Sequence, residues 1–255
     1  MSGLNIIHTI ERSFLLVRKD PALLLLFILP ALFPVERMIS NGLMIFIIVG
    51  PPEPASTRSI LLLVLYFVIG FFLGVWASAG AILKVTELEK GSKMGLQEAL
   101  SRGLERVPRL LVPALAGLAF YVLIIVGITI AVTPYMFVGM ASPGEDMSPS
   151  SIVLRVAMGF VAIVVLYFAT RLRLYAPACV LERNFGLKTS WKLVKGNWWK
   201  LLAILLVFGV MATIIGRIPV AGVYLSRMIV DPLTVIAVTL VYFQLGEARS
   251  STEEH

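Results

Sequence analysis

The sequence is short of the residues that build metal sites and catalytic centres. It holds one cysteine and two histidines. Cys179 alone cannot form an intramolecular disulfide or a multi-cysteine metal site, and a zinc site would have to collect His8 and His255 from the two ends of the chain. There is no GxSxG, HExxH or Walker motif, no serine–histidine–acid set and no pair of aspartates within an apolar run. We therefore expect no catalytic residue, no metal, no cofactor and no enzyme activity of the chain's own.

Charge is also scarce, and apolar residues are abundant. Charged residues make up 15% of the chain and hydrophobic residues 58%, with a mean hydropathy of +0.92. A soluble globular chain is about 45–50% apolar and about 25% charged. The composition predicts a single integral membrane domain over residues 1–255. The segment before the first apolar run holds Glu11 and Asp20 and does not fit a signal peptide, so we expect it to be retained.

Long apolar runs predict an all-α, polytopic membrane protein with six transmembrane helices. A helix needs about 20 apolar residues to cross the hydrocarbon core of a bilayer. The first run is interrupted from Glu36 to Asn41, so we interpret it as one helix followed by a segment, 42–49, that dips into the outer interface; a re-entrant return is the alternative. The six predicted spans are 21–38, 60–85, 110–140, 152–174, 201–218 and 223–245.

Lysine and arginine are distributed unevenly between the predicted loops. Cytoplasmic loops carry an excess of these residues. With both termini inside, 17 of the 22 basic residues fall in cytoplasmic segments, which are 1–20, 84–109, 171–200 and 246–255. The pattern predicts a multi-pass protein with cytoplasmic N- and C-termini, and the short loops favour a bacterial or archaeal plasma membrane. The net charge of +7 then indicates binding to anionic lipids and not to nucleic acid.

Three segments share one pattern: a short amphipathic helix, a corner, and then an apolar run. They cover about residues 4–18, 95–107 and 186–199, and they align at Pro21, Pro108 and Trp199. A helix with an apolar face and a basic flank lies in the membrane interface. The sequence therefore predicts cytoplasmic interfacial helices and an internal repeat of amphipathic helix plus helical hairpin. The expected apolar stripes are Ile7, Ile10, Phe14 and Val17; Leu96, Leu100, Gly103 and Val107; and Leu187, Trp191, Val194 and Trp198.

The run RLRLYAPACVLERNFGLKTSWKLVKGNWWKLL, together with LTVIAVTLVYFQL near the C-terminus, resembles a known group. It is similar to the membrane domain attached to some glycerophosphodiester phosphodiesterases and to related stand-alone six-helix integral membrane proteins of bacteria and archaea. The resemblance implies the six-helix fold but no activity, because the phosphodiesterase chemistry sits in a separate soluble barrel that is absent here. The sequence departs from the group at 246–249, where basic residues usually follow. The matching residues are Tyr175, Pro177, Glu182, Gly186, Ser190, Trp191, Lys195, Gly196, Trp198 and Tyr242.

Arg227 and Asp231 form the first candidate site. Four residues apart, they would share one face of the last predicted span, where ionisable groups are costly. Asp followed by Pro232 is also a good helix start, so the span could break there and hold a substrate or an ion, as in many transporters. The alternative is that Asp231 only neutralises Arg227 near the outer surface.

The second candidate site is the basic inner rim. Its residues could form a pocket for an anionic lipid headgroup, or they could only set the orientation of the chain. Within the second span, Gly70, Gly74, Ser78 and Ala81 predict close helix packing inside the bundle, with a dimer face as the alternative. The candidate headgroup residues are Arg171, Arg173, Lys188, Lys192, Lys195 and Lys200.

Two functions from different classes follow. The first is a lipid-associated scaffold or regulator without catalytic activity, whose partners are anionic membrane lipids and a partner protein or a second copy of the chain. The second is a small transporter or permease with a site near Arg227 and Asp231. A membrane-embedded enzyme acting on lipids is a third interpretation and would have to use Asp231, Glu182 and arginines alone.

Overall fold

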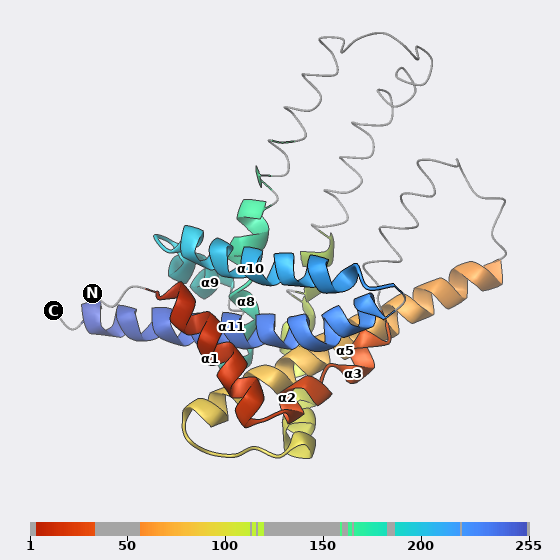
Figure 1. Ribbon diagram of the computed structural model, residues 1–255, viewed down its shortest axis with the longest axis horizontal. Helices are drawn as coiled ribbons and strands as arrows, with labels where there is room; N and C mark the ends of the chain where they lie inside the picture. The colour runs from red at the N-terminus through yellow and green to blue at the C-terminus, as the bar shows by residue number, and fades with distance from the viewer. Residues whose placement is uncertain are drawn as a thin grey trace, which may run out of the picture.

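The computed structural model describes residues 4–33, 57–112, 166–182, 187–219 and 221–253, with a few further positions between 114 and 164. Every regular element in this part of the chain is a helix, which confirms the predicted all-α class. The long helices are α5 (Thr57–Glu89), α10 (Trp198–Gly216) and α11 (Gly222–Glu253). Shorter ones are α1 (Ile6–Lys19), α2 (Ala22–Leu25), α3 (Ile28–Ala31), α8 (Tyr175–Leu181) and α9 (Leu187–Val194). The beginning of α1 and the end of α11 lie on the same side of the molecule (Figure 1).

Three helices of the described chain are long and apolar enough to cross a membrane. They are Val64–Glu89, Trp198–Gly216 and Gly222–Gly246, and they correspond to the predicted spans 60–85, 201–218 and 223–245. The predicted span 110–140 lies largely outside the described residues, the predicted span 152–174 is described only in part, and the segment 42–49 lies entirely outside them. The chain thus has the long apolar helices that a membrane protein requires.

The first predicted span, 21–38, is not one continuous helix in its described part, so that prediction is wrong. Helix α2 ends at Leu25 and α3 begins only at Ile28. Pro30 has no N–H to donate to the carbonyl one turn earlier, at Leu26, and its ring crowds that turn. The chain tightens there instead, and the Phe27 N–H donates to the Leu24 carbonyl over 3.0 Å.

Helices α10 and α11 pack along each other and build the largest apolar core. Leu233, Ala237 and Val241 are buried at four-residue spacing on α11, the spacing of one helix face. They belong to the same cluster as Leu201 and Ile204 of α10. The burial of these faces removes apolar surface from the surroundings and fixes the hairpin in register.

Helix α11 runs without interruption through Pro232, so the break considered as one alternative at Asp231 does not occur. Membrane helices tolerate proline because neighbouring hydroxyls and helices satisfy the freed backbone groups. Pro232 frees the carbonyl of Met228, one turn earlier, whereas the Thr234 hydroxyl donates to a different carbonyl, that of Val230, over 2.8 Å. The half-helix termini that would form a central ion site are therefore absent at this point of α11.

The predicted apolar stripe of α1 is only partly correct. The face that packs on the protein is formed by Thr9, Ser13 and Leu16, whereas Ile7 is 70% and Phe14 45% exposed. Burial of the polar residues is tolerated because each hydroxyl bonds a carbonyl one turn earlier: Thr9 donates to the Asn5 carbonyl over 2.8 Å, and Ser13 to the Thr9 carbonyl over 2.7 Å. An apolar flank of α1 is thus left facing outward.

The second predicted interfacial helix is confirmed in its faces but not in its corner. Residues 96–112 are helical, drawn in yellow in Figure 1, and the helix continues past Pro108. Pro108 has no N–H to donate to the Leu104 carbonyl, one turn earlier. Leu104 is 49% exposed, so solvent supplies the missing hydrogen bond. Of the predicted stripe, Gly103 and Val107 are buried, and Leu96 and Leu100 are half-buried; Gln97, Glu98, Ser101 and Glu105 are exposed as expected.

One face of α5 contacts this helix and the loop before it through three residues at four-residue spacing, Trp76, Gly80 and Lys84. The Trp76 indole donates to the Leu100 carbonyl over 2.8 Å. A Cβ added to Gly103 would lie 2.9 Å from the Gly80 nitrogen, so the two backbones touch directly. The close helix approach was predicted around Gly70, Gly74 and Ser78, but a Cβ on Gly74 would meet no atom within 4 Å.

Replacing Gly103 with alanine is expected to destabilise the protein by about 1–3 kcal/mol, the cost of overpacking a tight contact. The added methyl would meet backbone atoms of Gly80, which cannot move without shifting α5. Gly74→Ala is the matched control, since it adds the same methyl to open space on the partner helix α5 and favours helical backbone. Thermal unfolding in detergent micelles measures both; equal unfolding temperatures would contradict the close contact.

Candidate functional site

The residues that carry most of the sequence signal meet where α8, α9 and the start of α10 converge. Helix α9 ends at Val194, and Gly196, with φ +89°, turns the chain into α10 at Trp198. Only glycine adopts this left-handed conformation without strain. A corner between the third amphipathic segment and the following apolar run is therefore present, but it lies at Gly196 and not at Trp199 as predicted.

At this junction, five side chains form what we term the aromatic–arginine cluster: Tyr167, Phe168, Arg171, Trp191 and Trp198. The Arg171 guanidinium carbon lies 4.7 Å from the centre of the Tyr167 ring and 4.3 Å from that of Trp191. Both rings attract the cation through their electron-rich faces. The planar guanidinium is therefore held in one orientation, which a lysine ammonium could not match.

The rings of the cluster also contact one another. The Tyr167 ring centre lies 5.5 Å from that of Trp198, and the Phe168 ring centre 6.0 Å from that of Trp191. Trp199 follows in the chain and is 75% exposed. Aromatic side chains of this kind gather at the level of lipid headgroups, where one edge is apolar and the other is wet.

Helix α9 is docked by hydrogen bonds as well as by ring contacts. The Ser190 hydroxyl donates to the Arg171 carbonyl over 2.6 Å. Ser190, Leu193 and Val194 are buried, whereas Trp191 is 41% exposed, so the buried face of α9 is rotated from the predicted stripe. As in α1, the hydroxyl has a carbonyl partner, so the serine can be buried at little cost.

Glu182 ties α8, α9 and α11 together. Its carboxylate accepts a hydrogen bond from the Tyr242 hydroxyl over 2.5 Å and another from the Thr189 hydroxyl over 2.9 Å. Glu182 and Tyr242 were both among the residues that carry the family resemblance, but their contact spans 60 positions and could not be read from spacing. The carboxylate is engaged by two donors and serves as a clamp.

Cys179 lies beneath this clamp and is fully buried on α8. Burial, and to a smaller degree the Glu182 carboxylate, raises the pKa of its thiol from 9.0 to about 11. Burial likewise raises the pKa of the nearby Tyr175 hydroxyl. A buried thiol that stays protonated at neutral pH is chemically inert, so Cys179 is a structural residue.

The predicted headgroup residues divide into two kinds. Arg171 is fixed inside the aromatic–arginine cluster, whereas Arg173 and the lysines of α9 and the following turn point outward. Lys200 is half-buried at the start of α10. Within the described residues, none of this group forms an ion pair with a carboxylate. The outward-facing members are Arg173, Lys188, Lys192 and Lys195.

Arg227, one of the two residues of the first candidate site, contacts the end of the α2–α3 segment. Its Nη1 donates to the Phe33 carbonyl over 3.1 Å, and the Tyr66 hydroxyl donates to the Leu32 carbonyl over 3.0 Å. These carbonyls close the α2–α3 segment, where no further helical N–H is available, and a cation near such a terminus is favourable. Arg227 thus supports the end of α3, while Asp231 is exposed on α11.

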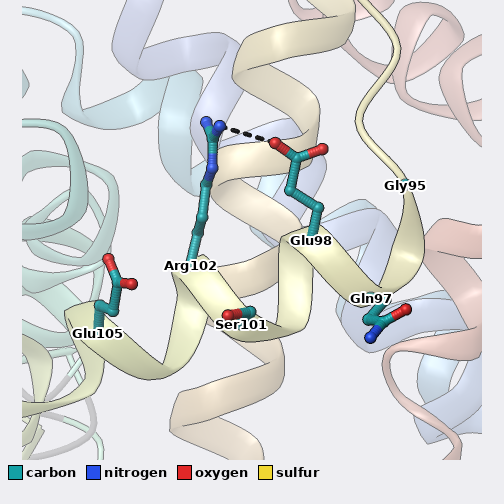
Figure 2. A pocket seen from close by; sticks show the side chains of 6 residues that line it. All are labelled: Gly95, Gln97, Glu98, Ser101, Arg102 and Glu105. Atoms are coloured by element: carbon teal, nitrogen blue, oxygen red, sulfur yellow. Dashed lines mark ion pairs between the residues drawn. The ribbon is translucent and has the colours of Figure 1, made fainter.

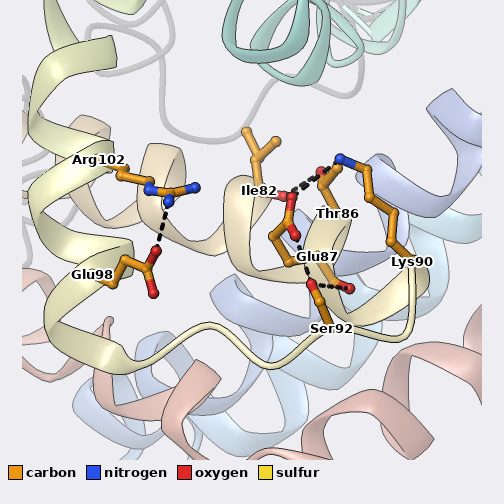
Figure 3. A network of polar contacts seen from close by, with 7 residues as sticks. All are labelled: Ile82, Thr86, Glu87, Lys90, Ser92, Glu98 and Arg102. Atoms are coloured by element: carbon orange, nitrogen blue, oxygen red, sulfur yellow. Dashed lines mark hydrogen bonds and ion pairs between the residues drawn. The ribbon is translucent and has the colours of Figure 1, made fainter.

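A shallow depression of about 610 Å³ lies along the helix over residues 96–112. Figure 2 shows that its walls are side chains of that one helix, with Glu98 and Arg102 paired over 2.7 Å. Figure 3 shows the neighbouring end of α5, where Glu87 pairs with Lys90 over 3.1 Å and accepts from Ser92 over 2.6 Å. The side chains of Glu87, Lys90 and Ser92 thus bond to each other and stabilise the turn after α5.

No cluster of His, Cys, Asp or Glu in the described chain could hold a metal ion.

Comparison with known proteins gives one match. The family model described as a domain of unknown function (DUF7847) matches residues 4–250. Neither the curated proteins nor the solved structures contain a match to this chain.

Proposed function

This chain belongs to the DUF7847 family, and we propose that it is an integral membrane protein that binds anionic lipid at its basic rim and serves as a scaffold or regulator for a partner protein or a second copy. The proposal assigns it no catalytic activity. The observation that carries it is the basic rim, Arg171 and its lysines, which lies directly beside an aromatic cluster and has no carboxylate partner among the described residues.

The charge of the rim supports lipid binding. Lys188, Lys192 and Lys195 project from one short stretch without carboxylate partners in the described chain. Each lysine near an anionic membrane surface contributes about 1 kcal/mol of attraction. The adjoining tryptophans supply the amphipathic rings that favour the headgroup layer. Together these features match a surface that rests on anionic headgroups.

Helix α1 supports the same placement. Ile7 and Phe14 are exposed on one flank of the helix, and Arg18 follows Phe14 one turn later. An apolar flank beside a cation is the arrangement of a helix that lies in the interface. We therefore propose that α1 and α9 both rest at the cytoplasmic surface.

The finer topology is part of the proposal. We infer six spans, cytoplasmic N- and C-termini, a plasma membrane location and an internal repeat. The long apolar helices α5, α10 and α11 support multiple crossings. Helices α1 and α9 each precede a sharp corner and a more apolar segment, which supports a repeated unit, although the second copy has no corner at Pro108.

The contacts support two further hypotheses to different degrees. The resemblance to the membrane domain of glycerophosphodiester phosphodiesterases stays a prediction, and the gathering of Glu182, Ser190, Trp191 and Tyr242 at one junction supports it. The transporter alternative has less support, because Arg227 bonds a backbone carbonyl and α11 is unbroken.

We expect the purified protein in neutral detergent to bind short-chain phosphatidylglycerol more tightly than short-chain phosphatidylcholine, because only the former carries net charge. Changing Lys188, Lys192 and Lys195 together to glutamine should weaken phosphatidylglycerol binding by at least about tenfold at low salt, given about 1 kcal/mol per lysine. Isothermal titration calorimetry measures both affinities. The triple arginine variant, which keeps the charge, is the matched control. Equal affinity of the unmodified protein for the two lipids would refute the proposal.

A further inference from the structure

We propose that Arg171 is a preorganised binding residue for the phosphate group of an anionic phospholipid, distinct in role from the lysines around it. This inference rests on the proposed function and sharpens it. The lysines attract any anionic surface, whereas Arg171 recognises the phosphate itself by shape.

The Arg171 side chain is held rigidly. Arg171 lies against the rings of Tyr167 and Trp191, at 4.7 and 4.3 Å from their centres, and its backbone carbonyl is bonded by Ser190. A guanidinium fixed in this way loses little further freedom when a ligand binds. Its planar donors match two phosphate oxygens at once. The exposed lysines of α9 offer no such fixed geometry.

The charge of Arg171 is not balanced by a carboxylate among the described residues. Arg171 is half-buried, and no carboxylate in the described chain forms an ion pair with it. The acidic residue on the neighbouring elements, Glu182, is engaged by the hydroxyls of Thr189 and Tyr242. A charge partly withdrawn from water is costly unless it is paired. An anionic ligand would provide the missing counter-charge.

Two N–H donors of the cluster have no acceptor within the described part of the chain. They are Nε of Arg171 and Nε1 of Trp198, and both are buried. Both side chains border the Tyr167 ring, so the two donors belong to one site. Buried donors without partners are rare in native structures, and phosphate oxygens would satisfy them. Since neighbouring side chains cover both donors, ligand entry should shift the half-buried Trp198, while Trp191 stays stacked on the guanidinium.

The position of the cluster selects a lipid as the source of the phosphate. Trp198 is the first residue of α10, one of the helices long enough to cross a membrane. The end of such a helix lies at headgroup level, and Trp199 beside it is largely exposed. A lipid phosphate in that layer would meet Arg171, while its acyl chains would run along the apolar surface of α10.

The test compares Arg171→Lys with Arg173→Lys in the protein in neutral detergent. Arg173 is exposed two residues away and outside the cluster, so both variants keep the charge, but only the first removes the stacked planar group. We expect Arg171→Lys to weaken short-chain phosphatidylglycerol binding by at least about tenfold, the loss of one bidentate charge-assisted contact, and to abolish the accompanying tryptophan fluorescence change. Arg173→Lys should bind within about twofold of the unmodified protein.

Failure of this inference is distinguishable from failure of the proposed function. If the unmodified protein prefers phosphatidylglycerol but Arg171→Lys binds equally well, the rim binds lipid and Arg171 is not its phosphate residue. If inorganic phosphate or glycerol phosphate at millimolar concentration gives the same Arg171-dependent fluorescence change with equal affinity, the assignment to a lipid is overturned.

A second pair of variants covers the case in which Arg171→Lys does not fold. Trp191→Phe keeps a ring face against the guanidinium, whereas Trp191→Ala removes it. We expect calorimetric binding of phosphatidylglycerol to be retained within about threefold by Trp191→Phe and to fall by about tenfold or more in Trp191→Ala, since a desolvated stacking contact is worth up to about 2 kcal/mol. Equal binding by the two variants would contradict a preorganised arginine.

Discussion

Replacing Lys84 with methionine is expected to lower the free energy of unfolding by about 3–5 kcal/mol, the cost of breaking a buried ion pair by removing one partner. Lys84 lies on α5 and is only 2% exposed. Its ammonium is 2.8 Å from a carboxylate oxygen of Asp20, at the corner after α1, and it donates to the Met94 carbonyl over 2.5 Å. Methionine keeps the length and the apolar stem but leaves both acceptors without their donor.

The same ion pair joins three parts of the chain, which explains why a large effect is expected. Asp20 also accepts the Ala22 N–H over 3.1 Å, and therefore holds the corner between α1 and α2. A second pair, Arg12 with Glu89, connects α1 to the end of α5. Loss of Lys84 would release the Met94 loop and the corner together, and leave the more exposed Arg12 pair and the apolar packing around Leu16 to hold α1 against α5.

Labelling of Cys179 measures how much stability the Lys84→Met protein has lost. The thiol is buried, and its pKa of about 11 leaves it about a hundredfold less ionised at pH 8 than a thiol with a pKa of 9. Labelling by a water-soluble thiol reagent should therefore be slow in the folded protein and rise with unfolding. The Lys84→Met protein should label at lower temperature or denaturant concentration than the unmodified one.

Asp20→Asn combined with Lys84→Met provides the control. If the pair carries the effect, the double variant should recover part of the stability lost by Lys84→Met, because asparagine leaves no uncompensated carboxylate. Lys93→Met, at an exposed position on the same loop, should have an effect within about 0.5 kcal/mol of zero. A Lys84→Met protein as stable as the unmodified one would show that the ion pair does not form.

The sequence could predict the features that depend on local pattern. Hydropathy alone locates α5, α10 and α11, because about 20 apolar residues in a row can be buried only in a core or a bilayer. The stripe through Gly103 and Val107 follows from the 3.6-residue period. The corner at Gly196 is marked by a glycine after a short amphipathic run.

The features that were missed depend on contacts between distant residues. The distribution of basic residues places Lys84 at the start of a predicted cytoplasmic segment. In the structure Lys84 is buried against Asp20, which lies 64 positions earlier in the chain. Its position directly after the apolar run of α5 was the available signal, since an ionisable residue at such a place requires a partner. The contact of Gly80 with Gly103 likewise joins two helices whose relative placement no local pattern specifies.

Polar residues on helix faces account for the remaining errors. Thr9, Ser13 and Ser190 are fully buried, although an apolar-stripe analysis assigns them to the outer side. Each donates to a backbone carbonyl, so burial does not leave an unsatisfied hydroxyl. In α11, the Asp231–Pro232 pair has the composition of a helix start, but packing of the flanking residues on α10 keeps the helix continuous.

Replacing Glu182 with alanine is expected to destabilise the protein by about 3 kcal/mol. The carboxylate accepts two hydrogen bonds, from Tyr242 and Thr189, and a hydrogen bond to a charged group contributes about 1.5–3 kcal/mol. Tyr242→Phe removes only one of them and should cost about half as much. Thermal unfolding in detergent measures each variant, and Glu105→Ala, which removes an exposed carboxylate on another helix, is the matched control and should be nearly neutral.

A double-mutant cycle separates the clamp from a general loss of packing. If the Tyr242 hydroxyl acts through Glu182, the combined Glu182→Ala and Tyr242→Phe variant should be less destabilised than the sum of the single changes, by about 1–2 kcal/mol. Strict additivity would contradict the contact. The clamp also holds α9, because Thr189 of that helix donates to Glu182. Loss of the Glu182 carboxylate should therefore loosen α9, which carries Trp191 and Lys192. Lipid binding should then weaken in Glu182→Ala even though that change removes a negative charge, a direction that electrostatics alone would not give.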